Sequence, residues 1–233
     1  MKKGLSVLVF AYNEEKFIKQ TIKNIIKSLV LSRINFEIII LNDGSKDKTK
    51  HIIENNFRNK SNIRIYNLKK NIGLSRLLQL GITKAKFDKL TWFPGDDSYL
   101  NKNLKKFFLK SNYHTFVIGF RKNIYDFPFL RRFLSLLNRT FINILNTVKI
   151  KDVHGLLIAR VSDLKKIKFI SSGYSLMVEI LPSITIKNVS YYQVPVYINK
   201  KTIKNSQTLS LQTFKDFIFC WCKVLIKVKI LNK

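Results

Sequence analysis

The 233-residue sequence contains little cysteine, glycine or proline. Its two cysteines, Cys220 and Cys222, lie two positions apart. A helix would point them in different directions, so we do not expect them to pair with each other. This cysteine usage is typical of a reduced, cytosolic protein. With eight glycines and four prolines, the chain is neither linker-rich nor of low complexity.

Long uncharged apolar segments are also missing. No stretch of about 18 apolar residues is free of charge, so we predict no membrane-spanning helix. The apolar run over residues 5–11 is short and is followed by Glu14 and Glu15, which argues against a signal peptide. The apolar fraction of 46% is ample for a packed core, and the length fits one α/β domain with a short appendage.

Acidic residues are scarce. The chain has 14 of them against 43 lysines and arginines, a net charge of +29. Nucleic acid, an anionic bilayer or phosphorylated substrates could each explain this charge, and a low-GC coding sequence could account for part of it. We find no nucleic-acid-binding module and expect no nucleic-acid partner. More than half of the acids fall in or beside the motifs below, which points to a metal: Glu14, Glu15, Asp43, Asp47, Asp96, Asp97, Asp152 and Glu179.

Strand-like and helix-like segments alternate over the first hundred residues. Helical apolar spacing follows the first strand, with Asn13 expected as the N-cap of that helix. The pattern predicts a Rossmann-like, mostly parallel α/β sheet with helices on both faces. Ligands of such sheets bind beyond the carboxyl ends of the strands, so the loops after strands one, two and four should converge. The strands are expected at 6–11, 36–41, 63–66 and 90–93.

The second half is less regular, and we divide the chain into a domain over residues 1–206 and a basic, amphipathic C-terminal helix over 207–233. In that helix, lysines punctuate a run of Phe, Trp, Ile and Val, as in helices that lie on an anionic membrane surface. A helix packed on the core or in a dimer is the alternative. Further elements are expected at 115–120, 129–145, 157–159, 177–181 and 191–198.

Four motifs occur in order: Leu-Val-Phe-Ala-Tyr-Asn-Glu-Glu (8–15), Leu-Asn-Asp-Gly-Ser-Lys-Asp-Lys-Thr (41–49), Asn-Ile-Gly-Leu (71–74) and Pro-Gly-Asp-Asp (94–97). Together they resemble the motifs of family 2 glycosyltransferases. The resemblance implies a GT-A fold and inverting transfer of a sugar from a nucleotide-sugar. It also implies a donor site formed by Ala11, Tyr12, Asn13, Glu14, Asp43, Gly44, Asn71, Gly73, Asp96 and Lys201.

Individual roles in this site follow from the side-chain chemistry. Asp43 could accept hydrogen bonds from a base or ribose, or it could simply form a turn. Glu14 could do the same with Tyr12 packed on the base, or it could favour a helix N-terminus. Asp96 and Asp97 correspond to the family's DxD site, with Gly95 in place of the first Asp and Asp97 aligned with the second. The resemblance implies Mg²⁺ or Mn²⁺ bound by Asp97 and Asp96.

The second half resembles, more faintly, the subgroup that glycosylates polyprenyl phosphates. Arg121 could contact a phosphate there, or it could be a surface residue. The acceptor is a polyprenyl phosphate or a sugar hydroxyl of a cell-surface glycan. Asp152 would be the base for a hydroxyl, whereas for a phosphate it would orient groups or be structural. We expect a cytoplasmic protein, peripheral at the inner face of the cell membrane. A non-catalytic nucleotide-sugar-binding protein is the alternative from another class.

Overall fold

The computed structural model describes residues 1–145, 149–169, 176–185, 190–203 and 218–226. One seven-stranded sheet has the order β3-β2-β1-β4-β6-β5-β7. Its long apolar runs form the central strands, as expected for strands covered on both faces. The strands are β1 (Lys2–Ala11), β2 (Phe36–Asn42), β3 (Ile63–Asn67), β4 (Phe87–Pro94), β5 (Phe116–Arg121), β6 (Leu156–Arg160) and β7 (Tyr191–Val196).

The sheet is mostly parallel. β1 pairs in parallel with β2 and β4, and β2 with β3. β6 is antiparallel to both β4 and β5, while β5 and β7 are parallel to each other. Every strand except β6 therefore ends at the same edge. The predicted mostly parallel α/β sheet is confirmed, although no pattern in the sequence indicated that β6 would separate β4 from β5.

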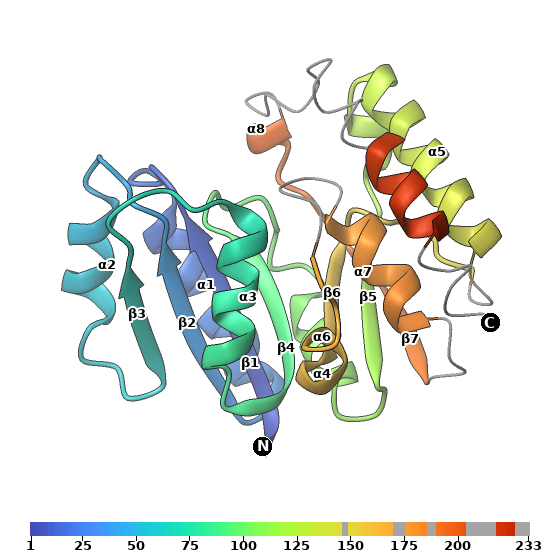
Figure 1. Ribbon diagram of the computed structural model, residues 1–233. Helices are drawn as coiled ribbons and strands as arrows, with labels where there is room; N and C mark the ends of the chain where they lie inside the picture. Colours follow the sequence, from blue (N-terminus) through green and yellow to red (C-terminus); the bar gives the residue numbers. More distant parts are fainter. Residues whose placement is uncertain (146–148, 170–175, 186–189, 204–217, 227–233) are drawn as a thin grey trace.

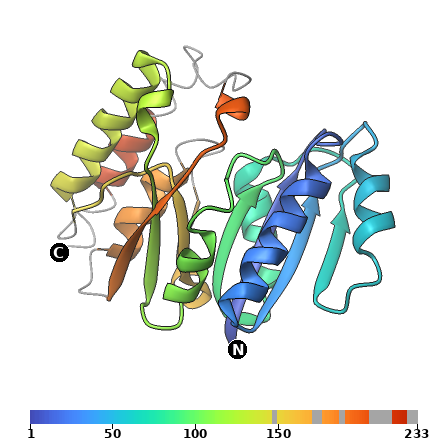
Figure 2. The ribbon, with the colours of Figure 1, turned by 180° about the vertical axis from the view of Figure 1, so that it is seen from behind.

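Helices cover both faces of the sheet (Figures 1 and 2). On one face, α1 (Ile18–Ser32), α2 (Thr49–Phe57) and α4 (Leu104–Lys110) pack through Ile22, Phe57 and Phe108. On the other, α3 (Leu74–Lys84), α6 (Val161–Leu164) and α7 (Leu176–Thr185) pack through residues such as Leu78. Alternation along β1 and β2 supplies both cores, because successive side chains of a strand point to opposite faces.

The remaining described helices lie beyond the sheet. They are the 3-10 turn η1 (Ile124–Asp126), the long helix α5 (Phe129–Leu145), the short α8 (Lys200–Ile203) and a helix over 218–226. The 218–226 helix lies along α5 (Figure 1), where the Trp221 and Phe141 rings stack with centroids 4.9 Å apart. The rest of the predicted 207–233 helix falls outside the described residues. Within the part of the chain that is described, no helix is long and apolar enough to cross a membrane.

One prediction about a helix start is wrong. α1 begins at Ile18, and the backbone N–H groups of Phe17 and Ile18 donate to the Glu14 carbonyl. Asn13 has a left-handed backbone with φ 57°, and its side chain accepts a hydrogen bond from the Lys46 N–H at 2.8 Å. It is therefore not the N-cap of α1, because a neighbouring loop uses its side chain.

Candidate active site

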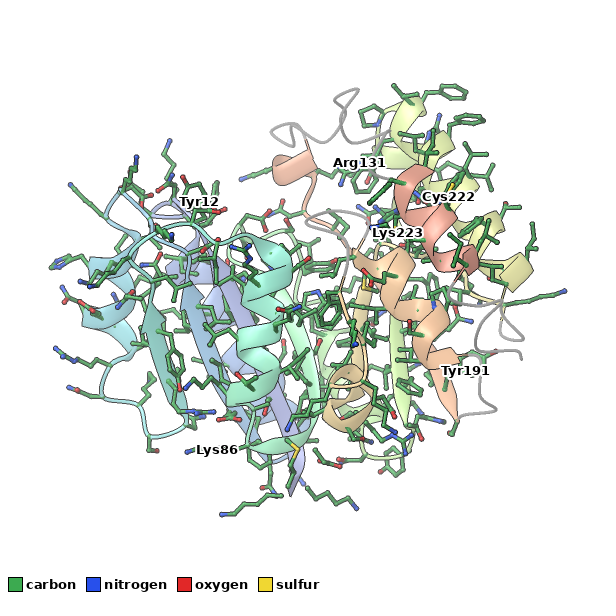
Figure 3. The ribbon with its side chains drawn as sticks, viewed as in Figure 1. Tyr12, Lys86, Arg131, Tyr191, Cys222 and Lys223 are labelled. Atoms are coloured by element: carbon green, nitrogen blue, oxygen red, sulfur yellow. The ribbon has the colours of Figure 1, made fainter. Side chains whose placement is uncertain are left out.

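The sequence motifs meet at the sheet edge where the parallel strands end. Ala11 ends β1, Asn42 ends β2 and Pro94 ends β4, so the loops that follow leave the same rim. Tyr12 stands at this rim with a largely exposed side chain (Figure 3). The predicted convergence of the three loops is therefore present.

The loops after β1 and β2 are fastened to each other by reciprocal hydrogen bonds. Asn13 donates its N–H to Ser45 Oγ at 3.0 Å, and the Lys46 N–H donates to Asn13 Oδ1 at 2.8 Å. The Glu14 N–H donates to Thr49 Oγ1 at 2.7 Å. Because both loops contribute donors and acceptors, Tyr12 and Glu14 are held on a rigid support rather than on a loose loop.

A second pair of bonds extends this fastening. The Glu15 N–H donates to Asp47 Oδ2 at 3.1 Å, and the Lys48 N–H donates to Glu15 Oε2 at 3.0 Å. Hydrogen bonds from the Thr49 and Glu15 N–H groups lower the pKa of Asp47, although burial opposes them. Glu15 and Asp47 thus join the two loops.

Asp43 is buried and joins a third loop to the rim. Its Oδ1 accepts from the Ile72 N–H at 2.8 Å and its Oδ2 from the Gly73 N–H at 3.1 Å. Gly73 has φ 82°, and Gly44 has φ 71° with no room for a side chain beside the Lys70 backbone. Both oxygens of Asp43 thus hold backbone of the 71–74 motif, whereas the sequence suggested a base or ribose as partner.

Glu14 and Asp96 form the electronegative part of the rim. Burial first, and then the charges of Asp96 and Asp47, raise the pKa of Glu14 to about 7. A carboxyl whose pKa is raised by burial and by neighbouring carboxylates favours a cation beside it. However, the described residues include no cluster of three or more acidic, histidine or cysteine side chains able to hold a metal by themselves. A divalent ion here would need further ligands from a phosphorylated substrate.

Gly95 sits where no side chain fits. A Cβ there would lie 2.9 Å from the Phe10 carbonyl oxygen and 2.9 Å from Ile18 Cδ1. An aspartate at position 95 would clash with the backbone of β1. The glycine that the sequence suggested as a lost carboxylate is therefore required by close packing.

Asp97 turns away from Glu14 toward α1. Its Oδ1 accepts a hydrogen bond from Asn24 Nδ2 at 3.0 Å, and its N–H donates to Thr21 Oγ1 at 2.8 Å. Burial raises the pKa of Asp97, and the Asn24 hydrogen bond opposes that rise. Asp97 has a left-handed backbone with φ 54°. Asp97 is thus held against α1, and the neighbouring charge of Asp96 also raises its pKa.

Arg121 and Asp152 form a buried ion pair on the far side of β4. The Arg121 Nε donates to Asp152 Oδ2 at 2.7 Å, and its Nη2 donates to Oδ1 at 2.8 Å. The Arg121 backbone N–H also donates to Oδ2. The two side chains are 5% and 3% exposed, and Arg121 Nη2 additionally donates to Ser135 Oγ of α5.

This pairing engages the Asp152 carboxylate and makes it a weak base. Burial alone would raise its pKa, but the Arg121 charge and hydrogen bonds outweigh burial and hold the pKa at about 2. Both of its oxygens are occupied by donors of the protein. The alternative structural role of Asp152 agrees with these contacts, and its role as a catalytic base stays a prediction. The guanidinium of Arg121 is likewise engaged with Asp152.

Arg131 and Tyr99 lie near this pair and were not singled out in the sequence. The charge of Arg131 bears on Tyr99 and on His154, while its guanidinium carbon lies 4.3 Å from the Phe127 ring. Figure 3 shows Arg131 between α5 and α8. The predicted helix at 129–145 placed Arg131 on α5, but only the packing of α5 reveals which of its arginines faces inward.

Lys201 and Asn71 complete the predicted set. The Lys201 N–H donates to Asn199 Oδ1 at 3.2 Å, and the Asn199 N–H donates to the Ser98 carbonyl at 2.8 Å. α8 is therefore tied to the loop that carries Asp96. Asn71 is exposed next to Gly44, on the loop that Asp43 holds.

Residues 6–168 match the family described as Glycosyl transferase family 2. The chain belongs to this family. This family 2 glycosyltransferase is 30% identical over 164 residues to a dolichyl-phosphate beta-glucosyltransferase of Trichomonas vaginalis, covering 64% of this chain and 50% of that protein. It is 28% identical over 172 residues to a dodecaprenyl-phosphate galacturonate synthase of Rhizobium johnstonii, covering 70% and 50%. The chain thus spans about half the length of these curated relatives.

Solved structures share the fold. Glucosyl-3-phosphoglycerate synthase from Mycobacterium tuberculosis, in complex with Mn²⁺, uridine diphosphate and glucosyl-3-phosphoglycerate, superimposes with a TM-score of 0.66 at 17% identity. The match covers 94% of this family 2 glycosyltransferase and 80% of that protein. The predicted GT-A fold is confirmed.

Proposed function

We propose that this chain transfers a sugar from a nucleotide-sugar to a polyprenyl phosphate, with inversion, at the cytoplasmic face of a membrane. An oxygen of the acceptor phosphate forms a bond to the anomeric carbon while the bond from that carbon to the diphosphate breaks. The observation that carries this proposal is the Arg121–Asp152 pair. The carboxylate suggested as acceptor base is locked in an ion pair, and an ionised phosphate is an acceptor that needs no base.

The names of the relatives support the same acceptor class, because both refer to a polyprenyl phosphate. On this proposal, Arg131 contacts the acceptor phosphate, since it lies on α5 near Tyr99 and its planar fork suits phosphate oxygens. Arg121 then acts through Asp152 and Ser135 to position α5 and does not bind phosphate itself.

On the donor side, Tyr12 packs on the base and Asn13, Glu14 and Gly44 lie along the nucleoside. Asp43 is a positioning residue that orders Asn71 and Gly73 beside them. Lys201, tied to the Asp96 loop through Asn199, faces the diphosphate. Fastening the loops in advance reduces the ordering that donor binding would otherwise require.

The donor set fits Mg²⁺ or Mn²⁺ held by Asp96, with Glu14 beside it and the diphosphate of the donor as further ligand. The raised pKa of Glu14 supports this assignment, because a bound cation would favour the ionised carboxylate. When bound, such an ion supplies Lewis-acid stabilisation of the departing diphosphate. The closed packing at Gly95 favours Asp96 as the second carboxylate of the DxD pattern, and Asp97 then positions the loop against α1.

Purified protein, a panel of UDP-, GDP- and dTDP-sugars, Mn²⁺ and a short polyprenyl phosphate test the proposal. Polyprenyl-phosphate sugar and nucleoside diphosphate should form in equal amounts. Transfer to a sugar hydroxyl instead would establish the glycan acceptor. Release of no nucleoside diphosphate from any donor would overturn the enzyme assignment.

The paired variants Asp96→Asn and Asp97→Asn test the metal assignment. Asp96→Asn should lower kcat by about 100-fold or more, an effect comparable to removing one electrostatic stabiliser of a transition state. It should also abolish the rise in melting temperature caused by Mn²⁺ with UDP. Asp97→Asn can still accept the Asn24 hydrogen bond and should keep both properties. The reverse pattern would return the metal to Asp97.

A further inference from the structure

Helix α5 presents an apolar stripe to solvent. Phe129 and Ile144, near its two ends, are 74% and 77% exposed, and Phe133 and Leu136 between them are each 46% exposed. These positions recur at helical spacing and so lie on one side of α5. Exposed apolar residues that occur singly are ordinary, whereas a contiguous row of them marks an interaction site.

The opposite side of α5 faces the protein and is held there by the buried Ile142 and by two polar side chains. Ser135 Oγ accepts a hydrogen bond from Arg121 Nη2 at 2.9 Å, and Asn138 Oδ1 accepts one from Trp221 Nε1 at 2.9 Å. Both residues are buried. These bonds fix the rotation of α5, so the apolar stripe cannot turn inward without breaking them. α5 thus carries apolar side chains on the side that faces solvent as well as on the side that faces the core, whereas an ordinary surface helix is polar toward solvent.

The 218–226 helix extends the same surface. Its inner side packs through Cys220 and Val224, while Ile218, Phe219 and Ile226 remain exposed. In the described part of the chain, seventeen large hydrophobic residues are exposed. Six of them lie between residues 125 and 144, and four between 218 and 226. More than half of the exposed apolar side chains therefore belong to two adjacent helices (Figures 1 and 2).

Cationic side chains border the apolar stripe. Arg132 and Arg139 lie seven positions apart on α5, on one flank of the stripe, and Arg139 is exposed. The Arg132 guanidinium carbon lies 5.9 Å from the rings of both Tyr125 and Phe129. On the second helix, Lys223 Nζ lies 4.0 Å from the Phe219 ring. Aromatic and aliphatic side chains with arginine and lysine at the border are typical of helices that lie in a membrane interface.

We propose that the outer surface of α5 and the 218–226 helix, centred on Phe129, Phe133, Ile144 and Phe219, docks on an anionic phospholipid surface. The net charge of +29 complements such a surface and disfavours a second copy of the same chain, which would carry the same charge. Apolar side chains enter the headgroup region, while Arg139 and Lys223 meet lipid phosphates.

This docking surface deepens the proposed function, which already places the chain at a membrane face and on which the membrane location rests, whereas the surface itself is inferred from exposure and charge. One consequence concerns the acceptor. Arg131 lies on the same helix but faces the site (Figure 3), so docking through α5 would bring the acceptor-phosphate position to the bilayer surface.

Vesicle sedimentation with the full chain tests the proposal, without donor or acceptor. The vesicles contain phosphatidylcholine with or without phosphatidylglycerol. We expect Phe129→Ser/Phe133→Ser/Ile144→Ser to lower the partition coefficient on anionic vesicles by about tenfold or more, since each buried apolar side chain contributes to interfacial binding. Arg139→Gln/Lys223→Gln should lower it by about tenfold on anionic vesicles only. The matched control Val30→Ser/Leu31→Ser removes two exposed apolar residues of α1 and should leave binding unchanged.

Circular dichroism and thermal melting verify that every variant folds. Equal vesicle binding by the triple variant and the wild type would overturn the proposal, as would binding that ignores phosphatidylglycerol. Gel filtration without lipid tests the remaining alternative, in which a second copy of the chain binds this surface. A dimer that the triple variant dissociates would show the surface to be a contact between copies and would also overturn it. A chain that binds vesicles through α5 but transfers no sugar would refute the proposed function and leave this docking surface established.

Discussion

Glu14 and Asp96 share the open rim of the sheet, whereas Asp43 and Asp152 each engage both carboxylate oxygens within the protein. This division separates residues that can meet a ligand from residues that hold the site in shape. Both kinds lie at strand ends, so sequence position does not distinguish them. The groups around each carboxylate distinguish them. Asp43 and Asp152 are surrounded by backbone N–H groups or a buried guanidinium, whereas Glu14 and Asp96 lie near another negative charge.

The buried Arg121–Asp152 pair predicts a large loss of stability in Asp152→Asn. The substitution leaves the Arg121 charge buried without a counter-ion, which typically lowers the free energy of unfolding by about 3–5 kcal/mol. The matched control is Asp163→Asn, which breaks the Arg160–Asp163 pair, whose side chains are 46% and 19% exposed. That change should lower the free energy of unfolding by less than about 1 kcal/mol.

Urea unfolding measures both free energies. A fully stable Asp152→Asn protein with normal unfolding but little turnover would instead restore Asp152 as a catalytic base. Asp152→Asn is therefore informative only when stability and kcat are measured on the same preparation.

His154 predicts a second loss of stability, dependent on pH. Burial first, and then the charge of Arg121, lower its pKa from 6.5 to about 4, although Asp152 opposes them. The unfolded chain binds the proton at higher pH than the folded one, so its contribution is complete above 6.5 and lost as pH falls toward 4. At about pH 5 His154 alone should lower the free energy of unfolding by about 2 kcal/mol relative to neutral pH, whereas Glu14, whose pKa is raised from 4.5 to about 7, adds a change of the opposite sign in the same range.

Comparison of the wild type with His154→Gln isolates the histidine: the difference between their free energies of unfolding should change by about 2 kcal/mol between neutral pH and about pH 5, as measured by urea titrations across the range. The stability that Asp152 contributes is present above its unfolded pKa of 3.8 and is lost as pH falls toward 2, below this window. An unchanged slope in His154→Gln would assign the acid sensitivity to other groups.

At the scale of elements, β5 and the start of β6 approach each other closely through their backbones. A Cβ on Gly155, just before β6, would lie 1.6 Å from the carbonyl oxygen of Gly119 in β5. A Cβ on Gly119 itself would lie 3.1 Å from Leu156 Cβ and Val196 Cγ1, which can adjust by small shifts.

Gly155→Ala should therefore destabilise the fold by about 3 kcal/mol or more, because strand backbone must move. Gly119→Ala, on the facing strand, should lower the free energy of unfolding by only about 1 kcal/mol. Thermal melts of the two proteins compare them directly. Equal melting temperatures would show that the backbones of β5 and β6 can move apart at little energetic cost.

The elements also show what the sequence could reveal. The helix predicted over 129–145 has those bounds in the structure, and the four early strands were located correctly because long apolar runs report burial. The short helix α4 and the antiparallel placement of β6 were missed, since neither leaves a periodic pattern of its own. Likewise, the four motifs identified the rim, but the Asp43 and Asp152 partners lie 29 and 31 residues away and needed coordinates.

At the scale of the whole molecule, the charge imbalance opposes compactness. With 43 basic and 14 acidic residues, most exposed cations have no acidic neighbour. Among the described residues, four ion pairs are formed, and only Arg121–Asp152 is deeply buried. Self-repulsion of this kind lowers the stability of a folded state.

Salt should therefore stabilise this protein. Raising NaCl from about 0.01 to 0.15 M shortens the screening length from about 30 to 8 Å and weakens repulsion between surface lysines. A gain of about 1 kcal/mol, or about 2–4 °C in melting temperature, is expected for a domain of this size. KCl at equal ionic strength should act alike. A melting temperature that falls with salt would mean that attraction within surface ion pairs outweighs repulsion between cations. The excess of cations would then no longer support an anionic partner.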